Sequence, residues 1–113
     1  MSKAKYSELF TAFAKAPMKA FLELLFEGVP LELKKRLIIE DVSYHRHNAD
    51  IVTLEAWMVI DNPESDLWIW VRVESDSSRD TIEEQFLTKD SYRKQELHSL
   101  EECFDYYERK NAK

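Results

Sequence analysis

The chain has 113 residues, a length that fits one domain and is short for two. Apolar residues make up 44% of it, including 6 Phe, 5 Tyr and 3 Trp, which is enough to bury a core and excludes a disordered chain. The only glycine, Gly28, excludes a phosphate-binding loop, a dinucleotide fingerprint and a nucleophile elbow, because each needs two or more glycines at fixed offsets. We therefore expect one α+β domain over residues 1–113, with no cofactor.

The first third of the chain has apolar residues at helical spacing, which predicts two helices over residues 4–15 and 17–27. Pro17 begins the second helix, where proline is tolerated in the first turn but would break a helix interior. We expect Gly28 to end this helix in the left-handed conformation, and Pro30 to open a short turn through Leu33.

The middle of the chain predicts a β-hairpin, because every second residue is apolar in both residues 51–61 and residues 67–74. The residues between them are mixed, and include the three tryptophans and several charged side chains. Residues 62–65 (Asn-Pro-Glu-Ser) have turn chemistry, and a four-residue loop there fixes the register of the two strands. The predicted pairs are Met58–Ile69, Ala56–Val71 and Leu54–Val73 on an inner face, and Trp57–Trp70 and Glu55–Arg72 on an outer face.

Residues 36–47 predict an earlier strand, joined to the hairpin by a three-residue loop at 48–50. This loop places Ile38, Val42 and Tyr44 on the inner face, and it leaves Glu40 facing inward, so the register stays open. The outer face then receives Asp41, Ser43, His45 and His47, beside Trp57.

The last third of the chain is expected to return to helix. Thr81 and Glu84 match a capping box, whereas Ile82, Glu84 and Phe86 also fit a short strand, and we favour helix over residues 81–88. Ser91 is expected to cap a further helix with one apolar stripe, formed by Leu97, Leu100, Phe104 and Tyr107. The predicted architecture is N-terminal helices, an antiparallel meander of three strands (four if residues 81–88 are a strand) and a C-terminal helix packed on one sheet face.

Two groups of side chains could carry chemistry. His45 and His47 point the same way on a strand and could share a metal ion with a third ligand, which Asp41, Glu55 or His98 would supply. Histidines beside a hairpin loop are usually ordinary surface residues, so we expect no metal. Cys103 and His98 could form a nucleophile and its base. Their five-residue spacing on a helix makes the two side chains diverge, and we expect Cys103 to be a packing residue and the protein to be non-catalytic.

The outer sheet face is the predicted binding site, because tryptophan combines a large apolar area with a polar N–H group. Either a helix covers this face and the tryptophans form a second core layer, or the face is exposed and binds a partner. The candidate binding residues are Trp57, Trp68, Trp70, Glu55, Arg72, Glu74, His45 and His47.

The net charge of −6 divides into +3 for residues 1–36, −9 for residues 37–84 and zero for residues 85–113. An acidic middle argues against direct nucleic-acid binding and favours a basic protein partner, although acidic surface also keeps a small protein soluble. The single cysteine, and the absence of a signal peptide or a long apolar run, predict a cytoplasmic protein away from membranes.

Three hypotheses follow from these observations. The first is an acidic inhibitor of immunity or antitoxin type that binds a basic protein. The second is a small-ligand domain or enzyme with a pocket lined by Trp, Tyr and His. The third is a homodimeric assembly protein that uses the tryptophan face as its interface.

Overall fold

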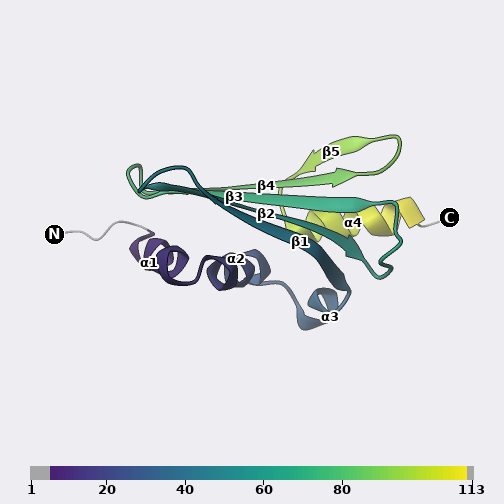
Figure 1. Ribbon diagram of the computed structural model, residues 1–113. Helices are drawn as coiled ribbons and strands as arrows, with labels where there is room; N and C mark the ends of the chain where they lie inside the picture. The colour runs from purple at the N-terminus through teal and green to yellow at the C-terminus, as the bar shows by residue number, and fades with distance from the viewer. Residues whose placement is uncertain (1–5, 112–113) are drawn as a thin grey trace.

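The computed structural model describes residues 6–111 and has a five-stranded antiparallel sheet with helices before and after it (Figure 1). The α+β class is confirmed, but the sheet has five strands instead of the predicted three or four. The elements are α1 Ser7–Lys15, α2 Pro17–Phe26, α3 Leu31–Lys34, β1 Leu37–Arg46, β2 Ile51–Ile60, β3 Trp68–Asp76, β4 Thr81–Lys89, β5 Lys94–Leu97 and α4 Leu100–Asn111. The strands are neighbours in chain order, β1-β2-β3-β4-β5.

The two N-terminal helices follow the predicted pattern. Pro17 lies in the first turn of α2, and Gly28 follows this helix with a φ of +76° in the left-handed region. Within the described part of the chain α1 begins at Ser7, and residues 4 and 5 of the predicted helix lie outside that part. The turn after Pro30 forms the short helix α3.

The β2–β3 hairpin has the predicted register, in which Met58 pairs with Ile69 and Trp57 pairs with Trp70. β1 follows its predicted register from Arg46 to Asp41, and a bulge at Glu40 then shifts the pairing by one residue. The predicted inner position of Ile38 is therefore wrong, because Leu37 and Ile39 take the inner positions and Ile38 pairs with Val59 on the outer face. The bulge leaves Glu40 exposed, which avoids burying its carboxylate in the core.

The predicted helix over residues 81–88 is wrong, because these residues lie in β4, which pairs with β3 from Thr81 to Lys89. Strand pairing places Phe86 and Thr88 in buried inner positions, and this long-range burial outweighs the local capping pattern. β4 continues through a tight turn into β5, where the Asp90 carboxylate accepts hydrogen bonds from the N–H groups of Tyr92 and Arg93 at 2.8 and 2.7 Å.

Ser91 therefore lies in a turn, and the helix predicted to follow it begins only at Leu100. Ser99 caps α4 instead, because its Oγ accepts a hydrogen bond from the Glu102 N–H at 3.2 Å. The Glu102 carboxylate accepts one from the His98 N–H at 2.6 Å, as in a capping box shifted by one residue. The cap lies after β5 because Leu97 is held in that strand, opposite Phe86.

One hydrophobic core joins the helices to the inner face of the sheet, and α3 contributes only the partly buried Leu33. Its buried residues come from α1, from α2 and the segment after it, from the inner positions of β2 to β5, and from α4. They are Phe13, Ala20, Phe21, Leu25, Val29, Val52, Leu54, Ala56, Met58, Ile60, Ile69, Val71, Val73, Phe86, Leu97, Leu100, Cys103 and Phe104. Because these helices all pack on one face, the outer face has no described helix over it (Figure 1).

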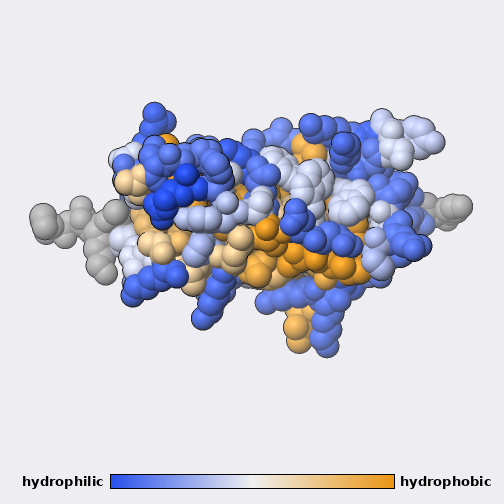
Figure 2. Space-filling view, in the orientation of Figure 1, coloured by the Kyte–Doolittle hydropathy of each residue, from blue (hydrophilic) through white to orange (hydrophobic). Residues whose placement is uncertain are grey.

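The core is less completely covered along β1, which is an edge strand. Leu37, Ile39 and Val42 on its inner face are only partly buried, although they pack against the core. Figure 2 shows an apolar area in the middle of the view, over β1 and between α2 and α3. This edge therefore exposes more apolar surface than the strands at the centre of the sheet.

Candidate functional site

The three tryptophans form a cluster on the outer face. The rings of Trp57 and Trp68 meet edge to face, with their centroids 6.3 Å apart, and the Trp57 and Trp70 centroids are 6.4 Å apart. All three side chains are half-buried. Val59 lies on the same face and is completely buried, although it is not part of the main core. The cluster is thus a sheet-surface patch that shields Val59, with partly exposed aromatic rings instead of a layer enclosed under a helix.

Charged side chains adjoin the tryptophans on the same face. Arg72 lies between two carboxylates, with its Nη2 3.1 Å from Glu74 Oε1 and its Nε 3.9 Å from Glu55 Oε1. These three half-buried side chains therefore carry a net charge of −1. Farther along β3, hydrogen bonds from Ser78 lower the pKa of Asp76, so this carboxylate also stays charged. The outer face thus has an aromatic end, where Lys89 lies opposite Trp68, and an end with more carboxylates, where Glu83 lies opposite Glu74.

His45 and His47 extend this face along β1. Their rings lie edge to face with centroids 4.5 Å apart, and His47 Nε2 is 2.8 Å from Thr53 Oγ1. His98 lies just before α4, outside this group. Within residues 6–111 no cluster of three or more His, Cys, Asp or Glu side chains is arranged to hold a metal ion.

Cys103 lies in the hydrophobic core and is completely buried. Burial raises the pKa of its thiol to about 12, with a smaller contribution from the Glu102 carboxylate. His98 is exposed. Because the thiolate is the reactive form, Cys103 is not activated as a nucleophile at neutral pH.

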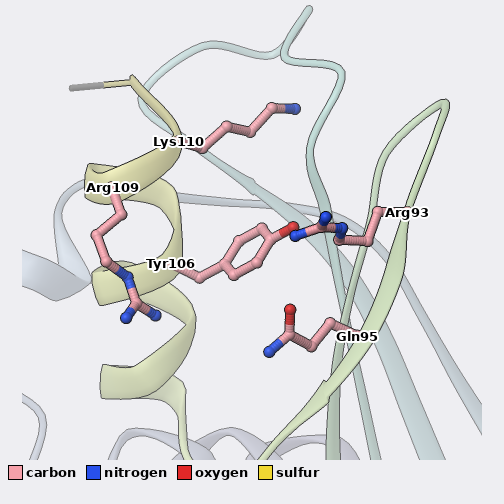
Figure 3. Close-up of a pocket in the computed structure, with 5 residues that line it drawn as sticks. All are labelled: Arg93, Gln95, Tyr106, Arg109 and Lys110. Atoms are coloured by element: carbon pink, nitrogen blue, oxygen red, sulfur yellow. The ribbon is translucent and has the colours of Figure 1, made fainter. Parts of the chain in front are cut away.

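A polar cavity of about 400 Å³ lies between β5 and α4 (Figure 3). Arg93, Gln95 and Tyr106 point into the space between the two elements, and Lys110 forms ion pairs of 3.1 Å with both Asp66 and Asp90. The lining residues are Arg93, Gln95, Tyr106, Arg109 and Lys110. This cavity differs from the predicted ligand pocket, because neither Trp nor His lines it. The sequence pattern does not indicate this cavity, because the cavity depends on β5 and the pattern predicts a helix there.

Comparison with known proteins finds no matching family model, no matching curated protein and no matching solved structure. Function is therefore inferred from the geometry of this chain. Within the described residues no helix has both the length and the apolar character needed to cross a membrane. The candidate binding surface is the outer face, which carries the partly exposed tryptophans and the carboxylates around Arg72.

Proposed function

We propose that the protein is a non-catalytic binding module of the cytoplasm, an acidic inhibitor of immunity or antitoxin type that holds a basic protein partner on the outer face of its sheet. The observation that carries this proposal is the cluster of Trp57, Trp68 and Trp70 on a face that no described helix covers. Partly exposed, contiguous tryptophans on one side of a sheet favour a binding surface, because tryptophan is enriched in binding hot spots.

The chemistry of the face suits lysine and arginine side chains. A cation placed over an indole ring is attracted by about 0.5–2 kcal/mol, with the larger values where water is excluded. Glu55 lies two residues from Trp57 on the outer face of β2, and Glu55 and Glu74 both form ion pairs with Arg72. A partner's arginine could therefore contact an indole ring and a carboxylate together, which favours a basic protein over a neutral one.

Charge also favours fast association with such a partner. Residues 37–84, which span β1 to β3 and the first residues of β4, carry a net charge of −9. This field should steer a basic protein toward the sheet, and the effect should weaken as the Debye length falls from about 10 Å at 0.1 M salt to about 3 Å at 1 M. The carboxylates should govern association, and the tryptophans should govern release.

The test is capture of a partner from the native host at low salt, followed by binding kinetics with the purified pair. We expect Trp70→Ala to speed release by about 30-fold or more, since a hot-spot residue contributes about 2 kcal/mol or more. Glu74→Gln should mainly slow association. The matched control is Tyr92→Ala, because Tyr92 is a 96% exposed aromatic residue in the β4–β5 turn and is not one of the three clustered rings.

Two results would contradict the proposal. One is a captured protein that binds Trp70→Ala as tightly as it binds the unchanged chain, with circular dichroism showing that the variant is folded. The other is no captured protein at all, together with a small molecule that quenches the tryptophan fluorescence of the pure chain. The second result would favour the ligand-binding hypothesis.

A further inference from the structure

β1 presents an unpaired edge. It pairs only with β2, and no other strand in residues 6–111 lies along its second side. From Glu40 to Arg46 every residue except Val42 is exposed. An edge of this kind carries free N–H and C=O groups, which can pair with another strand.

The direction of these groups follows from the pairing of β1 with β2. The His47 N–H donates to the Ile51 carbonyl at 2.9 Å, so His47 faces β2 with its main-chain groups. Because main-chain direction alternates along an antiparallel strand, Ser43 and His45 face β2 in the same way. The main-chain groups of Val42 and Tyr44 therefore point away from the sheet, toward the free edge.

The side chains along this edge suit pairing with a second copy of the same edge. Glu40 and Asp41 lie in its first half, and His45 and Arg46 lie in its second half. The side chains of Glu40 and Asp41 form no hydrogen bond or ion pair with any other described residue. When the strand is laid antiparallel to a copy of itself about Ser43, Glu40 lies opposite Arg46, and Asp41 lies opposite His45, whose ring carries an N–H donor.

We propose that two copies of the chain pair through β1 in this antiparallel register and form a two-fold symmetric dimer with a continuous sheet. Val42 of each copy then lies opposite Tyr44 of the other, and both residues have main-chain groups that face the free edge. The opposed side chains share a face, because Val42 and Tyr44 lie on the inner face and Asp41 and His45 on the outer face. The inner-face contacts between the copies would adjoin the partly buried Leu37, Ile39 and Val42, which lie in the apolar area over β1 (Figure 2).

Charge selects this register over its neighbours. A shift of two residues in either direction keeps the same faces together but separates Glu40 from Arg46. Arg46 is already held over the β1–β2 turn, where its Nε donates to Tyr44 Oη at 3.1 Å and its Nη1 donates to the carbonyls of Asn48 and Ala49. Its Nη2 group is left for Glu40 of the second copy.

The first test is sedimentation equilibrium of the full chain at low salt, from about 10 μM to 1 mM, because a short strand gives a small interface and a weak dimer. Glu40→Arg replaces two attractive pairs with two repulsive ones, so the dissociation constant should rise about tenfold or more. Arg46→Glu should do the same, and the double variant should restore the dimer. Glu64→Arg, in the exposed β2–β3 loop, makes the same charge change away from the edge and should have no effect.

The second test is a cross-link at the symmetry axis. Ser43 lies opposite itself in a non-hydrogen-bonded pair, where Cα atoms are about 4.5 Å apart and within the range that a disulfide spans, so Ser43→Cys should form a disulfide between copies. Ser91→Cys in the β4–β5 turn is the matched control and should not cross-link. The native Cys103 is buried and should not interfere.

The proposal is overturned if the chain stays monomeric over the whole concentration range. It is also overturned if a dimer forms whose dissociation constant is unchanged by Glu40→Arg and which gives no Ser43→Cys cross-link. The two copies would then meet at another surface. A dimer lost in Trp70→Ala and kept in Glu40→Arg would identify the tryptophan face as that surface.

Discussion

Asp61 joins the end of the sheet to the last helix, and its replacement separates two contributions to stability. Its carboxylate accepts two hydrogen bonds of 2.8 Å from the Arg36 guanidinium and one of 3.2 Å from Tyr107 Oη. Arg36 also contacts Glu108 at 2.7 Å and lies over the Phe104 ring. Asp61 has a φ of +65°, in the left-handed region. Residues other than Gly, Asn and Asp adopt this conformation only at an energetic cost.

The two contributions are measured with Asp61→Asn and Asp61→Ala. Asparagine tolerates the left-handed conformation and removes only the charge, whereas alanine removes the charge and also strains the backbone. The side chains of Arg36 and Asp61 are 31% and 39% exposed, so solvent screens the ion pair. We expect Asp61→Asn to lower the free energy of unfolding by about 1 kcal/mol, the upper end for a surface pair with two hydrogen bonds. Asp61→Ala should lower it by a further 1–2 kcal/mol, roughly the cost of the left-handed conformation.

The pH dependence gives this prediction a second readout. The Arg36 guanidinium lowers the pKa of Asp61 below its ordinary value, with a smaller contribution from Tyr107. A carboxyl group with a lowered pKa stabilises the folded state above its unfolded pKa of about 3.9, and this stability is lost as the pH falls through the folded pKa. Urea unfolding should therefore show the full difference between Asp61→Asn and the unchanged chain at pH 6, and a smaller one below about pH 4. Equal losses for the two variants, or a difference that does not change with pH, would refute this reasoning.

Two further predictions concern α4. Ser99→Ala should lower the free energy of unfolding by about 1 kcal/mol because it removes the helix cap, whereas Ser91→Ala in the β4–β5 turn should have almost no effect in the same urea titration. Cys103, with a pKa of about 12, should react with a thiol reagent only as fast as the folded chain opens, and the reaction should accelerate strongly once urea unfolds the protein.

The hairpin of β2 and β3 could be predicted pair by pair because both strands alternate without interruption. One register alone matches the inner aliphatic residues and also brings Glu55 opposite Arg72. The same reasoning predicted β1 only as far as Asp41. Simple alternation would bury Glu40, and the chain avoids this with a bulge, whose position depends on the fit between β1 and β2 and not on a local pattern.

The chain after β3 could not be predicted in the same way. Thr81 and Glu84 resemble a helix start, but β4 gains its stability from pairing with β3 and from burying Phe86 against residues far away in the chain. If β4 is predicted as a helix, no strand is left for β5 to pair with, and β5 is not predicted either. The cavity between β5 and α4 then cannot be predicted. The tryptophan cluster could be predicted from the sequence, because its three residues lie in one hairpin. The alternation of side chains along the two strands is enough to place them on the same face.

The two proposals have a common geometric consequence. Antiparallel pairing of two β1 edges places the two-fold axis perpendicular to the sheet, so the outer faces of both copies lie on the same side. A dimer would then present two tryptophan clusters to one partner, or to two partners side by side, and a partner with two basic sites would bind the dimer more tightly than the monomer. Glu40→Arg should remove this gain and leave the binding of a single site unchanged, whereas Trp70→Ala should weaken each site and leave the dimer intact. The failure of one proposal would thus be visible without the failure of the other.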